Sequence, residues 1–315
     1  MAIRSFLRTL IVMAILSVAF LFGGDGVSGA TDVGRTAADF LMIGHGARAA
    51  ALGGAYTAMA SGPTAAYWNP AGLADLDQTG LSVGHFAWLQ DIKVEQFSLG
   101  KPLGDRFSTA LSATYVNYGQ IDGYDVDGNA AGDLVAYDWV GGLSIGVGLT
   151  ESFSIGMTGK YVNQRLDDIS ASAFAADFGV HYRAESFALG AAVVNVGSKM
   201  TFDQTAEKLP AALRVGVMVR PFSEALVTSL EVEQRFYGDL YVRQGLELGF
   251  SDQYFLRAGY DYLPAQDGRW LATGITLGAG LHLGMVEADY AFTPNDHSTS
   301  EDLHRFTLTF LFGAR

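Results

Sequence analysis

Apolar and polar residues alternate with a spacing of two along most of this chain, from about residue 80 onward. Near the C-terminus Phe306, Leu308 and Phe310 share one parity, whereas Arg305 and Thr307 occupy the other. Successive side chains of a β-strand point to opposite faces, so each such segment meets an apolar environment on one side and a polar one on the other. The pattern predicts β-strands that separate two different environments.

The alternation divides into about fourteen segments of strand length, bounded by Gly, Asp, Asn, Pro or Ser. Tight connections such as Thr150-Glu-Ser152 alternate with longer polar ones such as residues 120–132, so the long loops share one end. Outer-membrane barrels have an even strand number and this distribution of loops. We therefore predict an all-β fold, a transmembrane antiparallel β-barrel of about 14 strands over residues 80–315. The segments begin near Leu81, Ile92, Arg106, Leu134, Phe153, Ser170, Phe187, Ala211, Leu226, Leu240, Tyr254, Trp270, Met285 and Leu303.

Charged residues within these segments keep mostly to the polar parity. An Arg or Lys that faces lipid at the middle of the bilayer costs about 2–4 kcal/mol, so a whole set of charges is expected inside the barrel. The mixed signs indicate internal pairing. A soluble sheet whose polar face meets water is the alternative. The predicted lumen residues are Lys160, Asp177, Arg183, Arg214, Glu231, Glu233, Arg235, Arg243, Glu247, Arg257, Asp261, Glu287 and Asp289.

The first thirty residues have the order of charge, apolar core and small residues that is typical of a secretory signal peptide. Arg4 and Arg8 precede an apolar run over residues 10–22, and Ser28-Gly-Ala30 follows. This predicts export with cleavage after Ala30, and localisation to the outer membrane of a Gram-negative-type bacterium. The run is shorter than the roughly 20 residues that a spanning helix needs.

Residues 31–79 lack the alternation and are rich in small residues. Gly46, Arg48, Gly53 and Gly54 precede a Trp68-Asn69-Pro70-Ala71-Gly72 turn. Glycine permits close approach of main chains and proline fixes a turn, so the segment suits a short helical and turn plug inside the barrel. An ordinary Gly/Ala-rich helix and turn is the alternative interpretation.

Composition narrows the possible partners. The 315-residue chain has a formal net charge of −13 and no cysteine. The acidic balance argues against nucleic-acid binding, which needs clustered Lys and Arg. Without cysteine there is no disulfide and no thiolate metal site.

One segment has the residue spacing of a calcium-binding loop. Asp125, Asp127, Asn129 and Asp133 stand at positions one, three, five and nine of a calcium loop. Positions six and twelve, which are Gly and Glu in that loop, are both Ala here. The alternative is a plain turn in an outer loop. The six histidines are scattered and no nucleophile motif is present, so we expect no enzymatic activity and no cofactor.

The segments Gly46-Ala-Arg48, Leu52-Gly-Gly-Ala55 and Ala66-Tyr-Trp-Asn-Pro-Ala-Gly-Leu73 resemble the N-terminal signature of the PorV/PorQ family, a branch of the FadL-like barrels. The resemblance implies a fourteen-stranded barrel in contact with outer-membrane lipid. It also implies two rival functions. The first is type IX secretion, with secreted cargo C-terminal domains and other secretion components as partners. The second is uptake of hydrophobic small molecules such as long-chain fatty acids.

Overall fold

The computed structural model describes residues 36–88, 92–202, 204–221, 225–238, 240–262, 274–294 and 302–313. The predicted signal peptide over residues 1–30 lies outside the described residues. The first five residues of the predicted plug segment and the last two of the predicted barrel segment also lie outside them.

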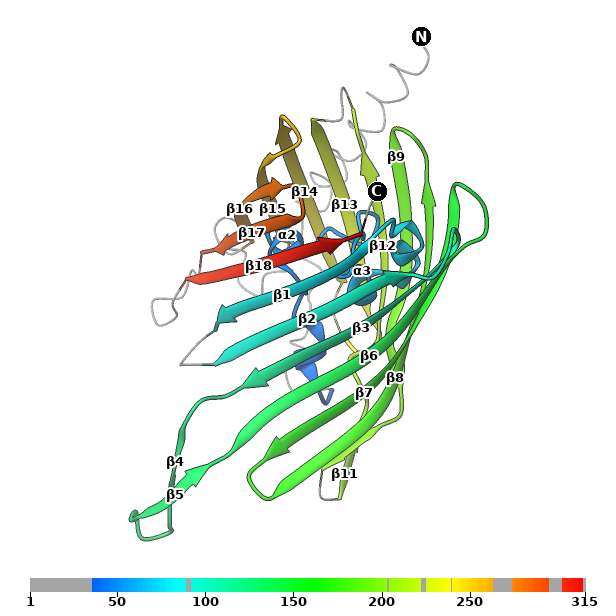
Figure 1. The fold of residues 1–315 in the computed structure, drawn as a ribbon. Coiled ribbons are helices and arrows are strands. Elements are labelled where there is room, and N and C mark those ends of the chain that lie inside the picture. The colour runs from blue at the N-terminus through cyan, green and yellow to red at the C-terminus, as the bar shows by residue number, and fades with distance from the viewer. Residues whose placement is uncertain are drawn as a thin grey trace.

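Fourteen strands within the described residues close into one antiparallel barrel, with β1 paired to β18 (Figure 1). The expected transmembrane-barrel fold of about fourteen strands is confirmed. Thirteen of these strands begin within two residues of their expected starts. The fourteenth, β16, begins at Ile275, and its expected start at Trp270 lies outside the described residues. The barrel strands are β1 (Thr79–Ala87), β2 (Lys93–Pro102), β3 (Phe107–Asn117), β6 (Ala136–Gly148), β7 (Phe153–Leu166), β8 (Ile169–Arg183), β9 (Phe187–Gly197), β12 (Ala212–Val219), β13 (Leu226–Arg235), β14 (Leu240–Phe250), β15 (Tyr254–Tyr262), β16 (Ile275–Leu283), β17 (Val286–Thr293) and β18 (Leu303–Phe312).

Two further hairpins extend from one end of the barrel. They are β4 (Ile121–Tyr124) with β5 (Ala130–Leu134), and β10 (Met200–Phe202) with β11 (Thr205–Glu207). Figure 1 shows both at the bottom of the view, and the start of β1 and the end of β18 near the opposite end. We call these the loop end and the terminus end. The sequence pattern predicts only polar loops where the two hairpins form.

The outward parity of the strands forms an apolar surface. Leu111, Leu143, Phe178, Leu246 and Leu308 are large, exposed side chains on different strands of the wall. Such a band is the surface that a barrel presents to lipid. No helix among the described residues is long and apolar enough to cross a membrane.

The described residues 36–78, which we call the plug, lie inside the barrel (Figure 1). The plug contains η1 (Asp39–Met42), α2 (Ala47–Ala51), α3 (Ala65–Trp68) and η2 (Pro70–Asp75). The Ala37 N–H donates to the Lys208 carbonyl just after β11, at 2.9 Å. Ser154 near the start of β7 donates to the Ala71 carbonyl at 3.0 Å. The plug therefore runs through the lumen from the loop end to the terminus end.

Glycines on the inner wall allow the plug main chain to touch the strands. A Cβ atom at Gly179 would overlap the side chain of Asn69, and one at Gly156 would overlap Pro70. A Cβ atom at Gly259 would overlap the main chain at Gly53. Small wall residues permit this close approach, which larger side chains would prevent. Gly146, Gly190, Gly245 and Gly278 have the same relation to the plug.

The inner wall is not polar throughout. Near the loop end the plug residues Phe40, Leu41 and Ile43 form one buried cluster with wall residues that include Val94 and Val116. These valines lie on the inward parity that elsewhere carries charge. Burial of this cluster contributes roughly 25 cal/mol per Å² of apolar surface, and it seats the start of the plug.

Candidate functional site in the barrel lumen

The stretch from Gly44 to Gly46 connects η1 to α2 within the plug. Gln96 on β2 holds it from both sides, because its Oε1 accepts the Gly46 N–H and its Nε2 donates to the Gly44 carbonyl, each at 2.9 Å. Gly46 has φ 83°, a conformation that glycine adopts without strain. The Ala47 N–H donates to Thr307 Oγ1 at 2.9 Å. The stretch is thus fixed to β2 and β18.

Arg48 on α2 reaches across the lumen to β14. Its Nε and Nη2 donate to Glu247 Oε2 and Oε1 at 2.8 and 2.7 Å. Arg257 Nε also donates to Glu247 Oε2, and Arg257 Nη1 to Asp289 Oδ1, both at 2.6 Å. Two cations and two carboxylates therefore form one chain from the plug through β14 and β15 to β17. Charge-assisted contacts of this kind are stronger than neutral hydrogen bonds.

The paired glycines that follow α2 both have positive φ, 65° at Gly53 and 83° at Gly54. The Gly53 N–H donates to Thr276 Oγ1 at 3.1 Å, and a Cβ atom here would lie 2.8 Å from the main-chain nitrogen of Tyr260. A Cβ atom at Gly54 would lie 3.1 Å from Arg243 Cδ. Conformation and space both require glycine at this turn.

The Trp-Asn-Pro turn lies in the interior of the plug. Trp68 Nε1 donates to the His45 carbonyl at 2.8 Å. Asn69 Nδ2 donates to the carbonyls of Thr57 and Val180 at 3.2 and 3.0 Å, and Asn69 Oδ1 accepts the Ala71 N–H. Asn69 thus caps η2 and joins the plug to β8.

Pro70 and Gly72 of this turn also have defined places. Pro70 stands at the first position of η2, where its missing N–H costs nothing. A Cβ atom at Gly72 would overlap the Ala60 carbonyl. The turn therefore packs against the preceding part of the plug as well as against the wall.

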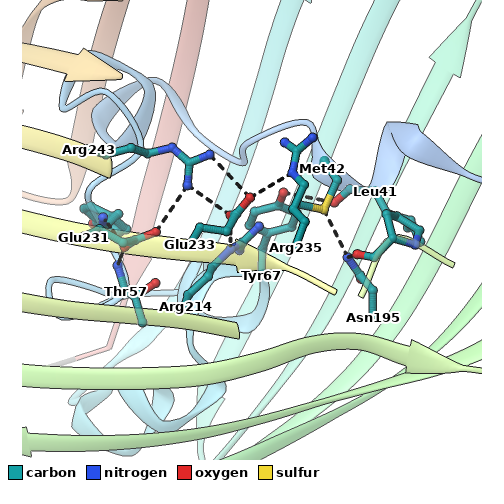
Figure 2. Close-up of polar contacts among 12 residues, drawn as sticks. Leu41, Met42, Thr57, Tyr67, Asn195, Arg214, Glu231, Glu233, Arg235 and Arg243 are labelled. Carbon is teal, nitrogen blue, oxygen red and sulfur yellow. Dashed lines mark hydrogen bonds and ion pairs between the residues drawn. The ribbon is translucent and has the colours of Figure 1, made fainter. Parts of the chain in front are cut away.

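A cluster of opposite charges surrounds Glu233 on β13, as Figure 2 shows. Arg214 Nε, Arg243 Nη1 and Arg235 Nε lie 2.8, 3.0 and 3.2 Å from its carboxylate oxygens. Antiparallel register places Arg214 directly opposite Glu233. The cluster is a product of cross-strand pairing of opposite charges.

The cluster extends to both sides. Arg243 also lies 3.6 Å from Glu231 and 3.2 Å from Asp261. Glu231 Oε2 accepts the main-chain N–H groups of Tyr56 and Thr57 at 3.0 and 2.7 Å, which ties the plug to β13. The whole cluster contains three arginines and three carboxylates.

A smaller pair lies at the irregularity between β8 and β9. Lys160 Nζ is 2.6 Å from Asp177 Oδ2 and donates to Asn195 Oδ1 at 2.8 Å. Asn195 has φ 58°, and its N–H donates to Asp177 Oδ1 at 2.7 Å where the register shifts. The buried charges here stabilise a bulge in the wall.

The remaining predicted lumen charges lie toward the terminus end. Glu287 is 3.6 Å from His282, and Arg183 is 2.6 Å from Asp75 of the plug.

His45 lies in the plug and is buried. This burial is the main reason why the pKa of its imidazole is lowered to about 4.

Two cavities of the lumen lie on different sides of the plug. The outer cavity, toward the loop end, has a volume of about 400 Å³, and residues that line it include Gly44, Trp88 and Arg305. The inner cavity, toward the terminus end, has about 290 Å³, and residues that line it include Gly46 and Asp289. The two share no lining residue. The plug therefore divides the lumen.

Sequence reasoning did not single out Gln96, Thr276 or Arg305 as lumen contacts. The alternation of the strands could have placed them on the inner face, since Arg305 alternates with Phe306, which faces outward. The alternation cannot show that these side chains reach the main chain of the plug, because that contact appears only in the folded structure.

The calcium candidates lie in the β4–β5 hairpin. Asp125 Oδ1 accepts the N–H groups of Asp127 and Asn129 at 2.9 and 2.8 Å, and these bonds lower the pKa of Asp125. Asp133 instead accepts a bond from Gln120 at 3.0 Å. The four residues do not converge, and the described residues contain no group of three or more metal-type ligands. The contacts are those of an Asx-type turn.

Comparison with known protein families shows to which family this chain belongs. Residues 29–234 match the family model described as type IX secretion system protein PorV. The chain belongs to the PorV family. The matched part includes the whole plug and the barrel through most of β13. No curated protein matches the sequence.

Several solved structures have a fold similar to that of this PorV-family chain. The toluene transporter TodX of Pseudomonas putida has 14% identity and a TM-score of 0.63, covering 85% of this chain and 98% of its own. The toluene transporter TbuX of Ralstonia pickettii has 13% identity and a TM-score of 0.63, with 87% and 100% covered. A Pseudomonas aeruginosa FadL homologue has 14% identity and a TM-score of 0.53, with 91% and 99% covered. At such identities the likeness concerns the fold alone.

Proposed function

We propose that this chain is a non-enzymatic outer-membrane component of type IX secretion that binds exported cargo and delivers it at the cell surface. The PorV-family match supports the assignment to this secretion system, because it includes the plug as well as the barrel. Cargo that carries a shared C-terminal domain is the expected partner.

The division of the lumen is the observation that carries this proposal. The outer and inner cavities share no lining residue, and the plug between them is joined to β2, β13, β14 and β18 by hydrogen bonds. A folded cargo protein has no space in such a lumen. Cargo is therefore expected to contact the loop end, which faces the outside in outer-membrane barrels.

The β4–β5 hairpin is the most prominent described feature of the loop end (Figure 1). The exposed side chains of Tyr124 and Val126 lie at its tip region. Exposed apolar groups on a projecting hairpin are suited to contact with a partner protein. We assign the first contact with cargo to this hairpin.

Affinity capture from native outer membranes tests both parts of the proposal. A tagged wild-type chain should recover secreted proteins that share a C-terminal domain. A variant with a short Gly-Ser link in place of residues 121–134 should recover at least tenfold less, which corresponds to about 1.4 kcal/mol. Two glycines inserted in the Thr150–Ser152 turn at the terminus end provide the control. Recovery of no such proteins by the wild-type chain contradicts the secretion role, and equal recovery by the hairpin variant contradicts the hairpin contact alone.

Passage of hydrophobic small molecules is the second candidate. The observation in its favour is the outer cavity of about 400 Å³, which falls within the range of small-molecule sites, in a barrel whose fold resembles that of toluene transporters. Uptake of toluene and of a long-chain fatty acid should then fall when the gene is deleted and recover on complementation. Unchanged uptake in the deletion strain contradicts this candidate.

A further inference from the structure

The inner cavity, which lies toward the terminus end, is lined by more negative than positive charge. Among its described lining residues, Arg48 is the one with a permanent positive charge. His45 also lines the cavity, but it is neutral near pH 7 because its pKa is about 4. Four carboxylates line the same cavity, namely those of Asp75, Asp77, Glu287 and Asp289.

Charged side chains just behind the lining reduce this excess without removing it. Arg183 and Arg257 do not line the cavity, yet each forms an ion pair of 2.6 Å with a lining carboxylate. Glu247 also lies behind the lining and pairs with Arg48. Together these are three arginines against five carboxylates, so two negative charges remain among the described residues. The pairs are Arg48 with Glu247, Arg183 with Asp75, and Arg257 with both Glu247 and Asp289.

The two carboxylates without an arginine are those of Asp77 and Glu287. Within the described part of the chain, Asp77 forms no ion pair. Glu287 has only His282 Nδ1 beside it, at 3.6 Å, and an imidazole is mostly neutral above its ordinary pKa of about 6.5. Asp77 is exposed and Glu287 is partly exposed, so a ligand in water can reach both from the terminus end.

A second, independent feature of the cavity is the hydroxyl group of Tyr56. This side chain is only 3% exposed and lines the inner cavity, with its ring packed edge-on against Trp68. Its hydroxyl forms no hydrogen bond with the described residues, although its main-chain N–H donates to Glu231. A polar group this deeply placed normally has a partner. A phenolic oxygen can accept a hydrogen bond from an ammonium group that enters the cavity.

The remaining features favour an organic cation over a metal ion. The described residues contain no group of three or more side chains that could hold a metal ion. The volume of about 290 Å³ is close to the lower limit for sites of small organic molecules. Pro63, Leu76 and Leu311 add apolar surface to the lining. Two negative charges beside an apolar wall suit an alkyl chain that carries two ammonium groups.

We propose that the inner cavity binds a linear alkyl diamine that enters from the terminus end. Asp77 and Glu287 balance its two charges, and the Tyr56 hydroxyl accepts a hydrogen bond from one ammonium group. The site lies on the other side of the plug from the outer cavity and selects for positive charge. It is independent of the secretion role, since it requires neither cargo nor other secretion components.

Calorimetric titration of the purified full-length barrel in detergent, near pH 7.5, tests the proposal with four probes. They are 1,5-diaminopentane, pentylamine, 1,5-pentanediol and magnesium chloride. The diamine should bind, and pentylamine should bind about tenfold more weakly because it carries one charge fewer. The diol, which has a similar length and no charge, should give no measurable heat. Magnesium should not displace the diamine at equal concentration. This comparison uses the wild-type protein and depends on no variant.

Three variants then assign the binding to the named side chains. Glu287→Gln and Asp77→Asn should each weaken binding of the diamine about tenfold, and Tyr56→Phe, which removes only the hydroxyl, about threefold. Glu151→Gln and Asp105→Asn remove the same charges from exposed positions at the terminus end and should bind like the wild type.

Four results would overturn the proposal. They are failure of the diamine to bind, equal binding of diamine and diol, displacement of the diamine by an equal concentration of magnesium, and wild-type binding by all three lining variants. None of these results depends on cargo capture or on uptake of hydrophobic molecules, so the diamine site and the proposed functions can fail separately.

Discussion

Arg48 in the plug and Glu247 on β14 meet through two hydrogen bonds of 2.8 and 2.7 Å, although 199 positions separate them in the chain. Glu247 also accepts a bond from Arg257, which continues to Asp289 on β17. The plug is therefore not merely enclosed by the barrel. Its helix α2 is held by a charged chain that spans three strands of the wall.

Arg48→Met should loosen the plug. The substitution removes both bonds to Glu247 while it keeps an apolar stem of similar length, and lost hydrogen bonds to a charged group typically cost about 1.5–3 kcal/mol. Cells that produce the variant should become more sensitive to large antibiotics, and the purified barrel should unfold a few degrees lower, as measured by heat-dependent migration on gels. Arg106→Met at an exposed turn serves as the control. Wild-type sensitivity and wild-type unfolding in a correctly inserted Arg48→Met barrel contradict the role of the contact.

Asn69→Asp should disturb the contact between the plug and β8. The two side chains are nearly equal in size, but aspartate cannot donate to the carbonyls of Thr57 and Val180, which Asn69 Nδ2 bonds at 3.2 and 3.0 Å. A buried carboxylate facing two carbonyls is expected to cost about 1–3 kcal/mol or more. Limited proteolysis from the terminus end should cleave the plug faster in this variant. Asn117→Asp is the matched control, because exposed Asn117 uses its Oδ1 to accept the Gly119 N–H and aspartate retains that bond. Equal cleavage of all three proteins argues against the prediction.

The strand pattern and the inner plug could be predicted because both follow local rules. Glu231 and Arg243 alternate with apolar neighbours, so the period of two places them on the inner face without further information. Their mutual contact depends on the register of β13 against β14, which puts them directly opposite each other. Register depends on turn geometry and on pairing around the whole barrel, so the partners of each charge could not be predicted.

Other features depend on the plug and the wall together. Val94 and Val116 face inward because they cover Phe40 and its neighbours, yet by parity alone an apolar inward residue looks like an error in the pattern. Arg305 carries the correct parity, but only the assembled barrel shows that no described acid reaches it. The hairpins β4–β5 and β10–β11 also escaped prediction. The sequence of β4–β5 contains the Gly and Asp residues that are typical of loops, and each strand of β10–β11 has only three residues.

Acid should destabilise the plug through His45. Burial lowers the pKa of His45 from 6.5 to about 4 in the folded protein, whereas the unfolded chain keeps the ordinary value. Between these two values the unfolded state binds more protons, so the contribution to stability is complete above pH 6.5 and is lost as the pH falls toward 4. The largest slope is about 1.4 kcal/mol per pH unit. Unfolding midpoints at pH 7.5 and pH 5 should therefore differ more for the wild type than for His45→Gln. His304→Gln at the loop end is the control, and an equal difference in all three proteins contradicts the assignment to His45.

Gly179→Ala should displace the plug without any change in charge. The added Cβ atom on β8 would overlap the side chain of Asn69, so either the strand or the Trp-Asn-Pro turn must move. Overpacking of this kind commonly costs about 1–3 kcal/mol. Gly159 on β7 provides a close control, because nothing lies within 4 Å of a Cβ atom built there. Gly159→Ala should therefore retain the wild-type unfolding midpoint and antibiotic resistance, while Gly179→Ala should lower both. Equal behaviour of the two variants would mean that the wall does not hold the plug at Asn69.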